Sequence, residues 1–153
     1  MNVEERLQEL LDKQEVSELL LAFTGALDAK DWEAYGATFT PDATFTILDQ
    51  ERRGRDAIVA GPARDLERYA RLQHFSANHR IRIDGDEAHA SHYLIGVHVP
   101  DDADPSRHVD IGGRYDCRCV RTADRWLLAD VVLGVRWTAG GQFRIEDVPS
   151  GAG

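Results

Sequence analysis

Hydrophobic residues recur at helical spacing through most of the first half of the chain. Over residues 3–30 they fall three or four positions apart, which is the pattern of one buried helical face. Asp31 is a candidate N-cap for a short second helix over residues 32–39. Residues 54–71 return to helical spacing, and the Gly-Pro pair at 61–62 is expected to split that helix.

Alternating and β-branched positions dominate the second half, and one such stretch already precedes the third helix. The predicted strands cover residues 43–48, 75–83, 88–99, 109–121 and 126–137. Polar turn residues separate them, as in the hairpin signal Asp84-Gly85-Asp86. Helices followed by a run of hairpins are typical of an α+β fold, in which the helices pack on one face of a mostly antiparallel sheet.

Glycines inside the predicted long strands suggest that the sheet is strongly bent. They are Gly96, Gly112, Gly113 and Gly134. A bent sheet that helices close on one side forms a cone with a pocket inside. Because the chain has no internal repeat and no long linker, we predict a single domain over residues 1–153, with a short flexible tail from about residue 147.

Composition excludes several classes of partner. The chain carries 16 Arg and 2 Lys against 27 Asp and Glu, for a net charge of −9, which disfavours binding to nucleic acid or to an anionic membrane. No apolar run reaches the roughly 20 residues that cross a bilayer, and no signal peptide is visible, so a cytoplasmic protein is expected. Cys117 and Cys119 fit two thiols in a sheet, without a disulfide, zinc or redox motif.

Three polar residues interrupt the apolar pattern and are candidates for chemistry. Asp28 falls in the last turn of the long helix, where the helix dipole disfavours a carboxylate. His74 opens a strand, and His92 lies in the middle of the next one among small residues. A carboxylate beside a histidine builds a general base, because it fixes the tautomer and stabilises the imidazolium. Each residue is also compatible with a structural role: a solvated or capping Asp, and surface or core histidines.

Five short segments follow one another along the chain in a distinctive order. They are residues 27–32 (LDAKDW) after the long helix, 73–75 (QHF) at a strand start, 87–92 (EAHASH) in the next strand, 124–127 (DRWL), and the closing pair 136–137 (RW). In this order and spacing, which holds over most of the chain, they resemble the SnoaL-like branch of the NTF2-like superfamily, and scytalone dehydratase in particular.

This resemblance implies a cone of helices around a curved sheet, with an apolar cavity and no metal or organic cofactor. Asp28 and His74 match the positions of an Asp–His base in such enzymes, and His92 matches a second catalytic histidine. Arg136 matches an arginine near the pocket mouth. The resemblance also implies a homodimer or homotrimer that associates through the convex face of the sheet.

The chain departs from the dehydratase pattern at positions that contact the substrate. Leu27 and Ile47 stand where scytalone dehydratase has tyrosines that polarise the substrate carbonyl, which disfavours scytalone itself as the substrate. Arg114 and Asp116 stand where the dehydratase has small or neutral residues. They could bind a polar substrate or pair with each other, and Arg114 could stabilise an enolate.

The sequence therefore predicts a cofactor-free lyase of the dehydratase type, or a cyclase or isomerase, for a small hydrophobic substrate such as a polyketide, aromatic or terpenoid compound. His74 would act as the base and His92 as the proton donor. The candidate substrate-binding residues are Phe23, Ile47, Asn78, Arg114, Asp116 and Arg136. The alternatives are a non-catalytic protein that binds a small molecule in the same pocket, and an iron site built from two histidines and a carboxylate.

Overall fold

The computed structural model describes residues 1–141, so the predicted tail lies outside the described residues. The helices are α1 (Val3–Ala29), α2 (Trp32–Ala37) and α3 (Arg55–Asp65). The strands are β1 (Phe39–Ile47), β2 (Gln50–Arg53), β3 (Arg71–Asp84), β4 (Glu87–Val99), β5 (Val109–Arg121) and β6 (Trp126–Ala139). Within the described residues, no helix is long and apolar enough to cross a membrane.

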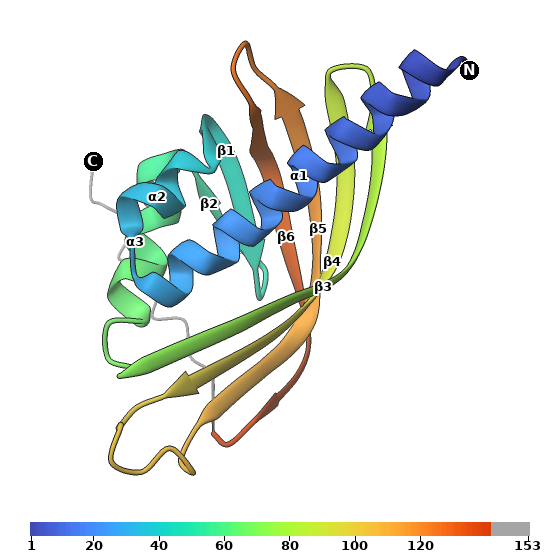
Figure 1. The fold of residues 1–153 in the computed structure, drawn as a ribbon. Coiled ribbons are helices and arrows are strands. Elements are labelled where there is room, and N and C mark those ends of the chain that lie inside the picture. Colours follow the sequence, from blue (N-terminus) through green and yellow to red (C-terminus); the bar gives the residue numbers. More distant parts are fainter. Residues whose placement is uncertain (142–153) are drawn as a thin grey trace, which may run out of the picture.

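The six strands form one curved, open sheet in the order β2-β1-β6-β5-β4-β3. Neighbouring strands are antiparallel except for β1 and β6, which run parallel. Helix α1 lies along the concave face of the sheet, and α2 and α3 pack at the end of the molecule beside β1 and β2 (Figure 1). The α+β prediction, with N-terminal helices on a curved and mostly antiparallel sheet, is confirmed.

Aromatic rings fill the centre of the core between α1 and the sheet. Phe23 of α1 stacks on Tyr35 with ring centroids 5.4 Å apart, and it makes edge contacts with Phe39 and Tyr115. Edge-to-face pairs of this kind add to the stability gained from burial alone. Phe23 was a predicted substrate contact, but it lies in this cluster, and it is not among the residues that line the cavity described below.

The N-terminal part of α1 differs from its predicted environment. Leu7, Leu10 and Leu11 continue the apolar face of the helix, but all three side chains are exposed. Asp12 marks the boundary, because it contacts Arg121 at the end of β5 and is the first buried residue of the helix. The residues before it therefore extend past the end of the sheet, where no strand can cover them.

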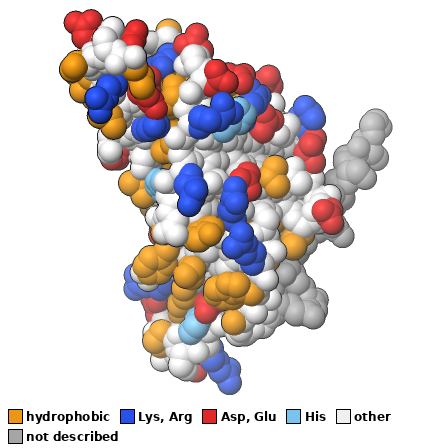
Figure 2. All heavy atoms as spheres, turned by 90° about the vertical axis from the view of Figure 1, so that its right-hand side faces the viewer, with side chains coloured by type: hydrophobic (Ala, Val, Ile, Leu, Met, Phe, Trp, Pro, Cys, Tyr) orange, Lys and Arg blue, Asp and Glu red, His pale blue; other side chains and the backbone are white. Residues whose placement is uncertain are grey.

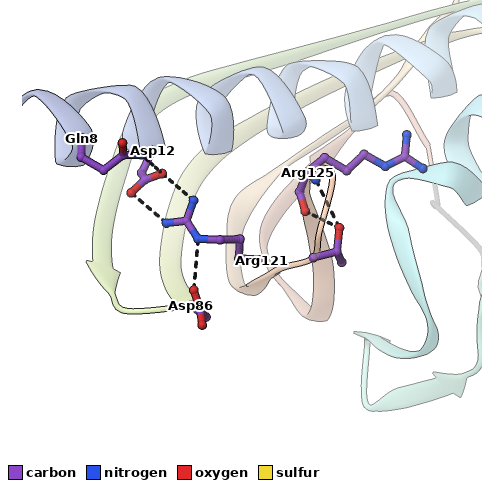
Figure 3. Close-up of polar contacts among 6 residues, drawn as sticks. Gln8, Asp12, Asp86, Arg121 and Arg125 are labelled. Carbon is purple, nitrogen blue, oxygen red and sulfur yellow. Dashed lines mark hydrogen bonds and ion pairs between the residues drawn. The ribbon is translucent and has the colours of Figure 1, made fainter.

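A buried ion pair holds α1 to the sheet at this boundary. The two terminal nitrogens of Arg121 donate to both carboxylate oxygens of Asp12 at 2.8 Å, and its Nε donates to Asp86 at 3.2 Å (Figure 3). The guanidinium also lies over the ring of Trp126, 4.3 Å from its centroid. The hydrogen bond from Arg121 lowers the pKa of Asp12, although burial acts in the opposite direction.

A β-bulge in β3 changes which side chains face the helices. The pairing of β3 with β4 shifts between Ala77 and Arg80, and Asn78 adopts a positive φ of 57° there. Even-numbered side chains such as His74 face inward before the bulge, and odd-numbered ones such as His79 face inward after it. Uninterrupted alternation would place His74 and His79 on opposite sides of the strand, and the bulge brings both to the inner side.

The edge of the sheet near α3 also differs from the prediction. Strand β1 begins at Phe39, and residues 50–53, for which no strand was predicted, form the short edge strand β2. Helix α3 continues through Pro62 to Asp65 instead of being split there. Pro62 lies one turn from the helix end, and its missing N–H removes one intrahelical hydrogen bond.

The substitution Asp12→Asn should lower the free energy of unfolding by about 2 kcal/mol, because it removes a charged hydrogen-bond acceptor that Arg121 needs. Because the pKa of Asp12 is lowered in the folded protein, this contribution to stability is complete above about pH 4 and is lost as the pH falls below that value. Urea unfolding at several pH values measures it. Asp102→Asn, which removes an exposed pair with Arg71, is the control and should leave stability unchanged. Equal losses in both variants would contradict the assignment.

Candidate functional site

A cavity with about 560 Å³ of empty space, its open mouth included, lies between the C-terminal end of α1, α3 and the sheet. Most of its wall is apolar. The apolar lining residues are Leu27, Phe45, Ile47, Pro62, Leu66, Leu94, Ile111 and Leu133. The polar lining residues are Tyr35, Arg52, Asp65, His74, His98 and Tyr115. An apolar pocket with a few convergent polar groups is the usual form of a small-molecule site.

Asp28 and His74 form a tight pair at this cavity. The Nδ1 atom of His74 lies 2.7 Å from Oδ1 of Asp28, and the backbone N–H of His74 donates to both carboxylate oxygens at 3.0 and 3.1 Å. Asp28 belongs to the last turn of α1, and His74 is the fourth residue of β3. The carboxylate thus joins the end of the helix to the start of an edge strand.

The pairing fixes the tautomer of His74. A carboxylate accepts hydrogen bonds, so the neutral imidazole carries its proton on Nδ1 and leaves the lone pair on Nε2. The ring lies over Gly96 of β4, where an added Cβ would come within 3.0 Å of Cδ2 and 3.2 Å of Nε2. Gly96 therefore provides the space in which the basic nitrogen sits.

His98 lies beside His74, with ring centroids 5.3 Å apart in an edge-to-face arrangement. Its Nδ1 donates to the carbonyl oxygen of Val109 at 2.9 Å, so the neutral ring carries its proton on that nitrogen. Burial lowers the pKa of His98 to about 4, so the ring is neutral at pH 7. At that pH His98 does not carry the extra proton that a general acid would need.

His92, the predicted second catalytic histidine, belongs to a different cluster and does not line the cavity. Its Nδ1 lies 2.7 Å from the Ser76 hydroxyl, which lies 2.7 Å from Nε2 of His79. His79 in turn contacts the Ser17 hydroxyl of α1 at 2.8 Å. Burial, with a smaller contribution from His79, lowers the pKa of His92 to about 4. The bulge in β3 makes this cluster possible, because it turns His79 inward.

Three predicted substrate contacts lie on the outer face of the sheet, away from the cavity. Arg114 and Asp116 project outward from β5 and pair with each other at 2.6 Å, so they do not lie inside as expected. Arg136 lies over the ring of Tyr93, 5.4 Å from its centroid, on the same outer face. The physical reason is strand parity: Tyr115 points into the core, so its two neighbours in β5 point out.

The remaining predicted contacts divide between the cavity and the surface. Ile47 lines the cavity, as expected. Asn78 occupies the bulge, where its side chain is exposed and does not contribute to the cavity wall. Sequence reasoning missed five of the six polar lining residues, which are Tyr35, Arg52, Asp65, His98 and Tyr115. His98 shares the inward parity of His92, which was a usable signal, whereas the short strand that carries Arg52 gave none.

A comparison with protein families finds one that matches most of the chain. Residues 8–132 match the family described as the SnoaL-like domain. The chain belongs to this SnoaL-like family. A search of curated proteins finds no match to this SnoaL-like protein.

Solved structures share the fold at low sequence identity. A candidate scytalone dehydratase from Novosphingobium aromaticivorans has a TM-score of 0.80 and 18% identity, over 94% of this chain and 97% of that one. A hexachlorocyclohexane dehydrochlorinase of type 2 has a TM-score of 0.78 and 14% identity, over 95% and 99% of the two chains. A candidate aromatic ring hydroxylase from N. aromaticivorans has a TM-score of 0.78 and 24% identity, over 86% and 94%.

The geometry defines what this SnoaL-like site can do. It offers an imidazole paired with a carboxylate, a second imidazole that is neutral at pH 7, and two buried phenols. Burial raises the pKa of both Tyr35 and Tyr115, which keeps the phenols protonated and able to donate. Across residues 1–141, no cluster of three or more His, Cys, Asp or Glu side chains is arranged to hold a metal ion.

His92 and His98 should remain neutral until the pH falls well below 6. Since both pKa values are about 4 in the folded protein, against about 6.5 in the unfolded chain, folding stability should decline as the pH drops from 6.5 towards 4. Histidine NMR titration checks the two values, with resonances assigned from His92→Gln and His98→Gln. A midpoint near 6.5 for either residue would contradict its buried environment.

Proposed function

We propose that this SnoaL-like protein is a cofactor-independent enzyme in which His74, oriented by Asp28, removes a proton from a carbon next to an activating carbonyl. The observation that carries the proposal is the 2.7 Å contact between the two side chains at the wall of an otherwise apolar cavity. Two structural neighbours are named for eliminations, a dehydratase and a dehydrochlorinase, which supports the same reaction class.

The reaction we favour is loss of water from a β-hydroxy carbonyl compound. Nε2 of His74 takes the proton, and the C–H electron pair forms the enolate while Asp28 stabilises the imidazolium. The enolate then expels the hydroxyl, which leaves as water with the proton that His74 had taken. Cyclisation or isomerisation would use the same enolate with a different second step.

Other cavity residues have roles that follow from their protonation. His98 lies beside His74 and is neutral at pH 7, so it does not protonate the leaving group. Tyr35 and Tyr115 are the phenols available to donate to the developing oxyanion. In this proposal the two phenols stabilise the enolate, which is the role that the sequence suggested for Arg114. The apolar wall favours a small hydrophobic substrate of aromatic, polyketide or terpenoid type.

The substitution His74→Gln should reduce turnover at least 100-fold, because it removes the base. A direct assay uses the aldol adduct of benzaldehyde and acetone, whose dehydration yields the absorbing ketone benzylideneacetone. Asp28→Asn should also reduce the rate, since the imidazolium loses its partner. His89→Gln is the control, because His89 lies on the outer face of β4. Binding without turnover in the wild-type protein would favour a non-catalytic binding protein, and full activity of His74→Gln would contradict the assignment of His74 as the base.

The outer face of the sheet carries an apolar patch that suits self-association. Phe75, Ile95 and Trp137 lie in one row across β3, β4, β5 and β6, with Tyr93 beside them, and each side chain is 43–50% exposed. Figure 2 shows hydrophobic side chains gathered on the lower part of a face, with basic side chains above them. Contiguous exposed patches of this kind usually mark an interface. A cytoplasmic homodimer or homotrimer through this face fits the patch.

The substitution Ile95→Lys should convert the oligomer to a monomer, because it places a charge at the centre of the patch. Light scattering coupled to size-exclusion chromatography measures the mass. Leu21→Lys, at an equally exposed position of α1, is the control and should leave the mass unchanged. A monomeric wild-type protein, or an unchanged mass for Ile95→Lys, would contradict association through this face.

A further inference from the structure

A buried arginine lines the cavity beside β2. Side chains alternate along this short edge strand, so that Arg52 points inward with 11% of its side chain exposed, while Arg53 points to solvent with 71% exposed. The guanidinium of Arg52 lies against α3 at Gly61, where an added Cβ would come within 1.8 Å of Nη1. A glycine on the facing turn of α3 therefore makes room for a positively charged group at the cavity wall.

The charge on Arg52 is only partly compensated. Its nearest acid is Asp65, whose Oδ2 lies 3.6 Å from Nη2, which is beyond hydrogen-bond distance. The other oxygen of Asp65 accepts a hydrogen bond from Arg64 at 2.8 Å, so two guanidinium groups share one carboxylate. Nη2 of Arg52 is buried and has no hydrogen-bond partner among residues 1–141. An unpaired buried donor of this kind is costly unless a ligand satisfies it.

Arg52 and His74 approach the cavity from opposite edges of the sheet. Arg52 belongs to β2 and His74 to β3, which are the two edge strands of the six. Both side chains line the same cavity. The floor between them is apolar and comes from the inner strands, with Ile47, Leu133 and Leu94 among its residues. A ligand that spans this floor meets a cation at one end and the base at the other.

We propose that Arg52 anchors a carboxylate of the substrate, so that the cavity takes an organic acid with an apolar body. A guanidinium matches a carboxylate in shape and charge, and it can donate two parallel hydrogen bonds to it. The anchored acid places its apolar part along the floor and presents a C–H bond to His74. This assignment rests on the proposed function only in taking the cavity as the substrate site.

The test compares benzoate with benzamide, which have the same shape and differ in charge. Isothermal titration calorimetry at pH 7, in a buffer without carboxylate or phosphate, should give at least about tenfold tighter binding of benzoate to the wild-type protein. Arg52→Gln should bring the two affinities within about twofold, and Arg52→Lys should restore part of the preference, since it retains the charge but not the planar fork. Arg53→Gln is the matched control and should keep the wild-type preference.

Gly61→Ala provides a second variant, which leaves the arginine at position 52 but fills the space that its guanidinium occupies. Alanine favours a helix more than glycine does, and the added methyl must displace the guanidinium, so the benzoate preference should fall. The assignment is overturned if wild-type protein binds both probes equally or binds no benzoate, or if either Arg52→Gln or Gly61→Ala keeps the full preference. His74→Gln should leave the preference intact, so a failure of the proposed base remains distinguishable from a failure of this anchor.

Discussion

The site depends on one carboxylate that ties a helix end to an edge strand. Asp28 lies where the dipole of α1 is unfavourable to a negative charge, and it accepts three hydrogen bonds from His74, two from the backbone N–H and one from the ring. These bonds fix both the path of β3 and the orientation of the imidazole. The same contact therefore closes the cavity at the start of β3 and sets the protonation of its basic nitrogen.

The two halves of the cavity perform different electrostatic tasks. At the β3 edge, the carboxylate of Asp28 would balance the positive charge of His74 in the proposed reaction. At the β2 edge, Arg52 shares Asp65 with Arg64 and retains an excess of positive charge. The apolar floor between the two edges keeps water from screening either charge. The curvature of the sheet brings these edge strands to one cavity, although they lie at the two ends of the strand order.

Periodicity predicted the elements well, because apolar spacing in α1 and alternation in the long strands reflect burial directly. The candidate pair Asp28 and His74 could be named from the sequence through the spacing of its motifs. The same reasoning misplaced Arg114 and Asp116, since it did not follow the parity that turns Tyr115 inward. Alternation of residues also could not predict the bulge at Asn78. The bulge depends on a positive φ at one residue, which the hydrophobic pattern does not reveal. Arg52 was missed because a four-residue edge strand is too short to show alternation.

The tautomer of His74 tests the central claim most directly. Ring nitrogen NMR of ¹⁵N-labelled protein, with the His74 resonances assigned from His74→Gln, distinguishes a protonated nitrogen from one that carries a lone pair. The account predicts a proton on Nδ1 and a lone pair on Nε2 of the neutral ring, and loss of this single tautomer in Asp28→Asn. A neutral ring with its proton on Nε2 would contradict the account, because the nitrogen assigned as the base would already be occupied.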